Sequence, residues 1–544
     1  MPDARSLLPV APPVTQAYPR RGLRRAAKVP SVDQLFRRYE SAKSARENFL
    51  RLWADAYEYM LPHRNLLGGH SPGSQKNERV FDSTGIEAIQ NFAGELMMAL
   101  TPPFRRWIEL KAGTDIPTEH RDSIDEQLEE QTRILFEAID HSNFATEINE
   151  SLLDLAIGTG ALLLQDSGDD YAPLRFTAVP LAQLIIEEGP RGTIETVFRN
   201  HSVPARNLER LWPQARWSAT AKTLMTQRPD EEVPLVEGTI YDEASGNYLY
   251  TVIEENGKHL ALADTLEDTP WIVFRWMKVA EASEPYGRGP ALTVLPDVKT
   301  LNRMVELHLR NAALATSGVY LAVDDGVLNP WNVELSPGSI IPVMRENSLQ
   351  PLERSGDLQF GSLMIERLQA SIRAKMYEPE LPPLEGQPRT ATELLQRNRI
   401  LLRKIGSSFG RLQQELVFRT VQKAVGILTR RGKMAPIRIN GREVDARYVG
   451  PLAQAQDQQD LEAVEQYMTL VGAMGPEIMM AGTRVEDIPA YIGKKLGIPQ
   501  SLLRDEAERE QIKQRAAEVA EAQLGADEAT NLETIEQTGA ARAA

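Results

Sequence analysis

Two long helical segments that flank a short strand-like stretch constrain the fold more than any other feature of this chain. The first, residues 290–316, has an apolar helical face and a basic one. These faces carry Leu295, Val298, Leu301, Val305, Leu309 and Ala312, and Lys299, Arg303 and Arg310. The second, residues 357–376, repeats Leu358, Ile365, Leu368, Ile372 and Met376 at helical spacing. Turn residues separate two short β runs between them, which predicts an out-and-back helix pair with a small β-containing tip.

A proline-rich acidic loop follows the second helix. It spans residues 377–389 and contains four prolines and three glutamates, which precede the first basic residue. These charged residues are Glu378, Glu380, Glu385 and Arg389. Thr390 and Glu393 then match a capping box and predict a helix that runs to about Arg431. A helix of roughly forty residues would be about 60 Å long, enough to cross a whole molecule.

Residues 31–285 are predicted to form an α+β body within a chain that is mainly α. Helical spacing over residues 31–61 predicts an amphipathic helix pair, and Thr84 with Glu87 predicts a capping box for the next helix. A second helical pair ends near Ile157, and strand periodicity prevails after it. The sequence therefore changes from helices to a sheet region before the long helices begin.

Two asparagine-glycine steps predict hairpins. Asn256-Gly257 separates alternating runs, and both central residues of a type I′ turn need positive φ. Asn440-Gly441 predicts a second hairpin. Residues 451–524 return to helical periodicity with an acidic excess, while residues 1–30, a basic arm, and residues 525–544 are predicted to be disordered.

Composition excludes several classes of protein. The chain has no cysteine, which removes disulfide scaffolds, thiolate zinc sites and cysteine nucleophiles, and fits a reducing cytoplasm. No apolar stretch is long enough to span a membrane, and residues 1–30 lack the apolar core of a signal peptide. The net charge of −15 argues against an ordinary duplex-DNA-binding domain, because such domains are usually basic.

Nucleotide-binding motifs are absent. The segment GGHSPGSQK has Ser74 where a phosphate-binding loop requires lysine. Glycine pairs beginning at Gly158 and Gly287 lack the third glycine of a dinucleotide fingerprint, so turn roles are expected for them.

Carboxylates and histidines do not form a recognisable site either. Adjacent carboxylates diverge on a strand, so solvated loops are expected for three acidic pairs in place of a two-metal site. These pairs are Asp169-Asp170, Glu187-Glu188 and Asp324-Asp325. The isolated histidines share no ligand spacing; they are His141, His201 and His259. The sequence predicts a non-enzymatic protein with no catalytic residues, metal or cofactor.

Basic stripes on the helices admit two interpretations. Arg397, Lys404 and Arg411 recur on one face of the predicted long helix, where a solvated face or salt bridges compete with nucleic-acid contact. The same two interpretations hold for four arginines on the out-and-back helices. They are Arg303, Arg310, Arg367 and Arg373.

Three segments resemble one protein family, in the same order along the chain. They are RVFDSTGIEAIQNFAGELMMALTPPFRRWIEL, EPYGRGPALTVLPDVKTLNRM and RTATELLQRNRILLRKIGSSFGRLQQEL. Together they look like the head-to-tail connector, or portal protein, of short-tailed (podovirus) bacteriophages. The resemblance covers roughly residues 33–430, and the acidic C-terminal region and the basic arm match it less clearly.

The resemblance implies a homo-oligomeric, dodecameric ring at the head-tail vertex of the virion, assembled in the host cytoplasm. It implies a portal fold with an α/β wing, a helical stem, a small clip and a helical crown. The ranges expected are 31–285 and 390–450 for the wing, 286–317 and 357–377 for the stem, 318–356 for the clip, 378–389 for a tunnel loop and 451–524 for the crown. Double-stranded DNA would pass through the channel without sequence recognition.

Site residues follow from that expectation. The tunnel-loop residues Glu378, Glu380, Glu385 and Arg389 would line the channel, and repeated glutamates would repel a DNA backbone that carries one charge per roughly 1.7 Å. The stem arginines, with Arg373 the first candidate, would form a second ring that grips weakly or acts as a valve. Leu328 and Trp331 of the clip are candidates for a docking surface.

The implied partners are the terminase large subunit, tail adaptor proteins, and the major capsid and scaffolding proteins, with no membrane. Two other classes stay open: an α/β enzyme with an unrecognised site, and a different virion component such as an internal ejection or scaffold protein. The enzyme would show turnover on a nucleotide, and the other virion component would be more continuously helical. A ring seen by electron microscopy would separate all three.

Overall fold

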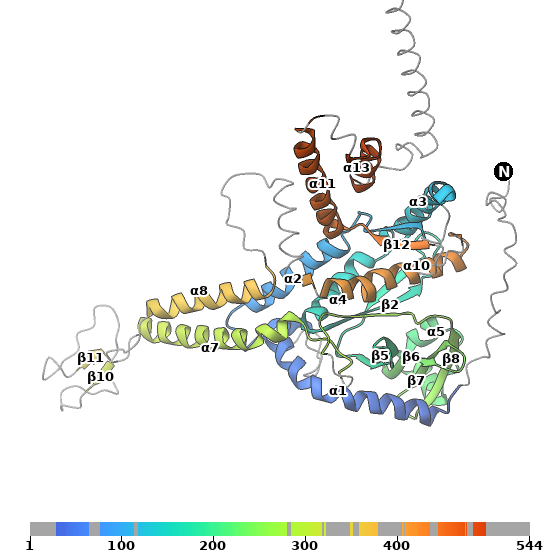
Figure 1. The fold of residues 1–544 in the computed structure, drawn as a ribbon. Coiled ribbons are helices and arrows are strands. Elements are labelled where there is room, and N and C mark those ends of the chain that lie inside the picture. Colours follow the sequence, from blue (N-terminus) through green and yellow to red (C-terminus); the bar gives the residue numbers. More distant parts are fainter. Residues whose placement is uncertain are drawn as a thin grey trace, which may run out of the picture.

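A body of helices and sheets carries one projecting helical arm (Figure 1). The arm consists of α7 (Pro290–Ser317) and α8 (Leu358–Lys375), which lie side by side. The computed structural model describes residues 29–64, 77–113, 118–279, 284–317, 320–322, 349–351, 358–378, 405–406, 408–435, 444–473, 475 and 482–496. The predicted out-and-back helix pair is therefore present, with its ends within a few residues of those expected.

One half of the body is a five-stranded antiparallel sheet between helices. Its strand order is β4 (Leu184–Glu188), β5 (Ile194–Pro204), β6 (Glu232–Asp242), β7 (Asn247–Glu254) and β8 (His259–Leu266). The first half of α1 (Val32–Met60) packs on one face, and α5 (Leu208–Leu211) and α6 (Ala219–Gln227) pack on the other. Consecutive strand residues alternate between the two cores, as a period of two requires: Leu235 lies with α5 and α6, and Val236 with α1.

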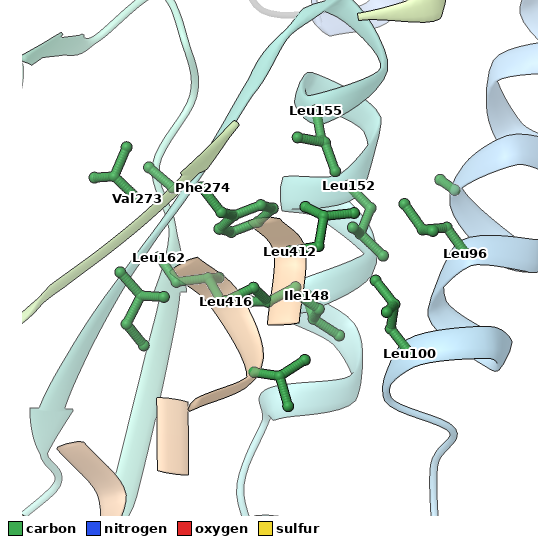
Figure 2. Packing of buried hydrophobic residues seen from close by; sticks show 14 of the residues in the cluster. Leu96, Leu100, Ile148, Leu152, Leu155, Leu162, Val273, Phe274, Leu412 and Leu416 are labelled. Atoms are coloured by element: carbon green, nitrogen blue, oxygen red, sulfur yellow. The ribbon is translucent and has the colours of Figure 1, made fainter. Parts of the chain in front are cut away.

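The other half joins helices to a three-stranded antiparallel sheet. That sheet has the order β3 (Leu174–Ala178), β2 (Thr159–Asp166) and β9 (Trp271–Arg275). It packs with α2 (Thr84–Leu100), α3 (Thr118–Asp140), α4 (Phe144–Ile157) and α10 (Phe418–Arg430). Figure 2 shows Leu96 and Leu100 of α2 facing Ile148 and Leu152 of α4, with Phe274 and Leu416 closing the cluster.

Smaller elements complete the described chain. β1 (Ile108–Ala112) pairs antiparallel with β12 (Val444–Tyr448), and the short strands β10 (Tyr320–Ala322) and β11 (Leu349–Pro351) pair near the outer end of the arm. After β12 come α11 (Pro451–Gly472) and α13 (Ile488–Leu496), within the range expected for a crown. Among the described residues, no helix has the length and apolar character that a membrane span requires.

Three local predictions need correction at helix ends and turns. Residues 32–60 form one helix, not a pair. The capping box predicted at Thr84 is wrong, because the helix begins at Thr84 and its N–H donates to Asp82 Oδ1 at 2.9 Å. The hairpin between β7 and β8 is confirmed, but positive φ falls on Gly257 (89°) and Lys258 (49°), one residue later than the predicted type I′ turn.

The glycine pairs do more than form turns: Gly158 makes the predicted turn, between α4 and β2, and also lies at a backbone crossing. They allow two backbone segments to cross, since a Cβ on Gly158 would lie 2.0 Å from the carbonyl oxygen of Gly287. A Cβ on Gly289 would likewise lie 2.1 Å from the carbonyl oxygen of Ala156. The Gly289 N–H donates to the carbonyl of Ile157 at 2.8 Å. The crossing therefore anchors the start of α7 against the end of α4.

One acidic pair is not in a solvated loop. Glu187 and Glu188 lie on β4, and Glu188 is buried beside Arg275 and Lys278, while Glu187 accepts a hydrogen bond from Arg38 Nε at 2.7 Å. Their ion pairs hold the sheet to its neighbours. Asp324-Asp325 and the Asn440-Gly441 hairpin lie outside the described residues, as do residues 1–28 and 525–544.

Candidate functional site

The apolar residues of the arm become more exposed with distance from the body. Near the body its apolar residues are buried; they are Leu295, Val298 and Leu301 of α7, and Ile372 with Met376 at the end of α8. Farther out, Leu309 is 52% exposed and Phe360 is 62% exposed, and Leu307 and Leu363 are exposed as well. Leu309 belongs to the apolar face predicted from helical periodicity, so part of that face is exposed on the outer arm.

The four predicted arm arginines have different surroundings. Arg303 and Arg310 are exposed, and each lies 2.6 Å from a carboxylate oxygen of Glu306. Arg373 lies 3.8 Å from Glu87, and Arg367 forms no ion pair with any residue that the structure describes. The basic stripe is therefore partly neutralised within the subunit, which favours the salt-bridge interpretation for Arg303 and Arg310.

A buried charged cluster, the Arg275 junction, lies at the root of the arm. Arg275 is only 3% exposed at its side chain, and its guanidinium donates to Glu415 at 2.6 Å and to Glu188 at 3.1 Å. It also donates to the carbonyls of Gly192 and Pro285. Burial disfavours the charged guanidinium, but the two carboxylates outweigh it and raise the pKa of Arg275.

Glu415 reaches Arg275 from a π-helical turn. Residues Gln413–Val417 form this turn within the helix that continues as α10, so the predicted long helix is locally widened. The Arg275 backbone N–H also donates to Glu415 Oε2 at 2.9 Å. The junction consequently ties β9, β4, the approach to α7 and the π turn to one side chain.

The loop after α8 leaves the helix through a Schellman motif. The Glu378 N–H donates to the carbonyl of Arg373 at 3.1 Å, and the Tyr377 N–H donates to that of Ala374 at 3.3 Å. Tyr377 has φ of 65° at the position where glycine is usual. Its ring packs against Trp276 and Phe92, at centroid distances of 5.5 and 6.2 Å, which holds it in this conformation.

The predicted tunnel-loop residues are only partly within the described chain. Glu378 accepts a hydrogen bond from Asn91 Nδ2 at 3.3 Å and lies 4.0 Å from Arg373, so its carboxylate is held against the body. The described residues do not include Glu380, Glu385 or Arg389 of the loop, or Leu328 and Trp331 of the tip. They also leave out Arg397 and Lys404.

Sequence reasoning did not identify the Arg275 junction or the anchor at Tyr377. Glu415 and Arg275 are separated by 140 residues, and no periodicity relates them. Tyr377 gives no local signal because tyrosine is rare at a C′ position. Within the described ranges, no three acidic or histidine side chains could hold a metal ion together.

Comparisons with known proteins agree with the resemblance. The chain is 25% identical to the portal protein of Salmonella phage epsilon15 over 179 residues, which is 32% of each protein, so the match spans about a third of that relative. Two solved structures are also similar. One is from the virion of a native gene transfer agent particle, with 13% identity, 79% of this chain and 96% of the other covered, and a TM-score of 0.36. The other is from the neck of an empty particle of that agent, with 14% identity, coverage of 80% and 98%, and a TM-score of 0.35.

The sequence match carries the family assignment, since both TM-scores are below 0.5. The family model described as "Bacteriophage head to tail connecting protein" matches residues 32–503, well over half of the chain. Consequently the chain is a structural protein and not an enzyme, and it belongs to the family of bacteriophage head to tail connecting proteins.

Proposed function

We propose that this connector assembles as a closed, dodecameric ring at one capsid vertex, and that double-stranded DNA passes through its centre during packaging and ejection. The observation that carries the proposal is the exposed apolar surface on the outer half of the arm, including Leu309 and Phe360. Burying one such side chain contributes about 1.5–3 kcal/mol. Arms of neighbouring subunits would cover this surface and form the channel wall.

The charge of the arm fits a conduit that does not hold DNA tightly. The described arm helices contain six basic residues, Lys299, Arg303, Arg310, Arg367, Arg373 and Lys375, and three acidic ones, Asp297, Glu306 and Glu366. Ion pairs join several of them, such as Lys375 to Asp297 at 2.5 Å. A wall with little free positive charge releases few counterions from DNA and therefore binds it weakly.

The tunnel loop would add repulsion at one level of the channel. Its start is anchored by Tyr377 and Glu378 at the end of α8, and we assign Glu380 and Glu385 to the channel surface, with Arg389 at its end. Their charges would act over a range of roughly 10 Å at 0.1 M salt. Arg367 and Arg373 would face DNA from the stem.

The remaining parts would contact other virion proteins. We assign the tip, with Leu328 and Trp331, to docking of the terminase large subunit and later of tail adaptor proteins. The body would be the wing, surrounded by major capsid and scaffolding proteins, and α11 and α13 would belong to the crown. Assembly would take place in the host cytoplasm.

A packaging assay with purified rings tests the channel. The E380Q/E385Q variant should form normal rings but change the rate of DNA packaging or the retention of packaged DNA, because it removes two charges per subunit. A matched control, E209Q/E232Q, removes two exposed charges from the body and should behave like the unmodified protein. E378Q should have a smaller effect, since that carboxylate is already held by Asn91 and Arg373. Equal behaviour of E380Q/E385Q and the control would overturn the assignment of the loop.

A further inference from the structure

A shallow hollow of about 350 Å³ lies where the loop between α2 and β1 meets the C-terminal end of α3. Its rim includes Phe104, Arg105 and Arg106 from the loop, and Phe136 of α3 forms an apolar part of its floor. Phe136 is held in place by Trp107, edge to face at 5.2 Å. The hollow therefore combines an apolar floor with a basic and aromatic rim.

Phe104 is displayed to solvent by a strained backbone. It is 83% exposed, the highest value for a large apolar side chain in the described part of the protein. Its φ of 58° lies in the left-handed region, which is unfavourable for a residue with a side chain, and two prolines precede it. Backbone strain that keeps an aromatic ring in water points to a role for that ring in recognition.

The neighbouring arginines are not held in ion pairs with described residues, although the charge of Arg106 helps to lower the pKa of Glu130. Arg105 and Arg106 are exposed and form no ion pair there, whereas Arg133, beside them, is paired with both Glu130 and Glu137. Two adjacent guanidinium groups are thus free to bind carboxylates in bidentate fashion.

The aromatic rim extends past the arginines. His141 lines the hollow and stacks on Tyr171 at a centroid distance of 4.5 Å, and Tyr171 is itself 70% exposed. Clusters of aromatic and arginine side chains of this kind are typical of the energetic centre of protein interfaces.

The acidic residues of the hollow argue against a nucleic-acid ligand. Glu137 and Asp140 line the same surface, and partial burial raises the pKa of Asp140. Their carboxylates would repel the regularly spaced phosphates of a nucleic acid. A peptide can instead place its carboxylates over Arg105 and Arg106 and its amide N–H groups, from which Glu137 and Asp140 can accept hydrogen bonds, over the acidic side. A protein segment with its own carboxylates above the arginines suits this distribution better.

We infer that this hollow docks a segment of another protein in which a large apolar side chain is flanked by carboxylates. The apolar side chain would lie between Phe104 and Phe136, and Arg105 and Arg106 would bind the carboxylates. The inference rests on the proposed ring. In that ring the arm would form the channel wall, and α3, which lies on the opposite side of the body from the arm (Figure 1), would face away from the channel and be open to a partner.

Peptide binding to the purified full chain tests whether the hollow recognises an apolar side chain flanked by carboxylates. A fluorescent peptide SDEFDES should bind saturably, and the peptides SDEADES and SNQFNQS should bind at least about tenfold more weakly. F104A and R105E/R106E should each weaken binding of SDEFDES by a similar factor. The control R210E/L211A alters an exposed arginine and an exposed leucine on α5 and should bind as the unmodified protein does.

No saturable binding of SDEFDES, or equal binding of all three peptides, would overturn the inference. A photoreactive amino acid at position 104 supplies a second readout that does not depend on a disruptive substitution. In assembled rings it should form no crosslink between copies, and crosslinked copies would show that the hollow is a subunit interface. Electron microscopy of the same sample separates the two proposals: rings without peptide binding refute only the docking site, and single subunits refute the ring.

Discussion

The Arg275 junction and the outer half of the arm differ in whether their charged and apolar side chains are buried or exposed. At the junction, the buried Arg275 is paired with carboxylates on two other elements, and every one of its guanidinium nitrogens is bonded. On the outer arm, charged residues such as Arg303 and Arg310 are exposed and apolar residues such as Leu309 and Phe360 are exposed with them. The junction is complete within one subunit, whereas the outer arm leaves apolar side chains exposed that the proposed ring contacts would cover.

The largest expected effect on subunit stability is that of R275M. Loss of the cation leaves the carboxylates of Glu188 and Glu415 without their main partner, and removing one member of such a buried set lowers the free energy of unfolding by about 3–5 kcal/mol. Urea denaturation monitored by tryptophan fluorescence measures it. The control R288M removes an exposed arginine paired with Glu284 and should cost less than about 1 kcal/mol. Similar losses in both variants would show that the Arg275 junction stabilises the subunit no more than an exposed ion pair does.

E415Q should have a smaller effect at the same place. The amide keeps the shape of the side chain but loses its charge, so we expect a loss of about 1–3 kcal/mol in the free energy of unfolding. In the double variant R275M/E415Q the losses should not add, and the coupling should be about 0.5–3 kcal/mol. Additive losses would mean that Arg275 and the π turn act independently.

In contrast to the charged junction, His201 is mostly buried as a neutral group, and this makes the free energy of unfolding depend on pH. Burial and then the nearby charge of Arg199 lower the pKa of His201 from about 6.5 to about 4. The folded protein disfavours protonated His201, so its contribution to stability is complete above pH 6.5 and is lost as the pH falls toward 4.

H201N should therefore reduce the loss of stability between pH 7 and pH 4 by up to about 2 kcal/mol. Urea denaturation at both pH values, compared with the unmodified protein, provides the measurement. An unchanged pH dependence in the variant would contradict the burial of His201 in a neutral form.

The smallest effect on stability is expected on the outer arm. L309S/F360S alters side chains that are already exposed, so the free energy of unfolding should change by less than about 0.5 kcal/mol. Ring formation, measured by analytical ultracentrifugation, should nevertheless fall by at least about tenfold, since buried apolar area would be lost at each contact. L211S changes an equally exposed leucine on α5 and should leave assembly unaltered. If both variants assemble normally, the arm does not form the contact between subunits.

The sequence predicts those elements whose signal lies in their own residues. Regular apolar spacing predicts α7 and α8, and alternating residues with Asn256-Gly257 predict the β7–β8 hairpin, because each signal lies within the element itself. The junction could not be predicted in this way. Arg275 and Glu415 meet only after two distant segments fold together, and Gly158 and Gly287 appear as separate turn residues until their backbones cross.

For the candidate site, helical spacing indicates which helices carry the four arm arginines, and their role stays a prediction. The pairs of Arg303 and Arg310 with Glu306 have the i,i+3 and i,i+4 spacing that a helical sequence itself indicates. The contact of Arg373 with Glu87 depends on the position of α2, which periodicity cannot reveal. Glu378 is held by Asn91 of α2, far away in sequence. The assignment of Glu380 and Glu385 to the channel stays a prediction.

A cryo-electron microscopy reconstruction of the purified full chain tests the central claim most directly. We predict a closed ring around an axial opening, with α7 and α8 forming its wall and with Leu309 and Phe360 buried between neighbouring subunits. Single subunits at every concentration, or a ring that carries these helices on its outer edge, would contradict the account.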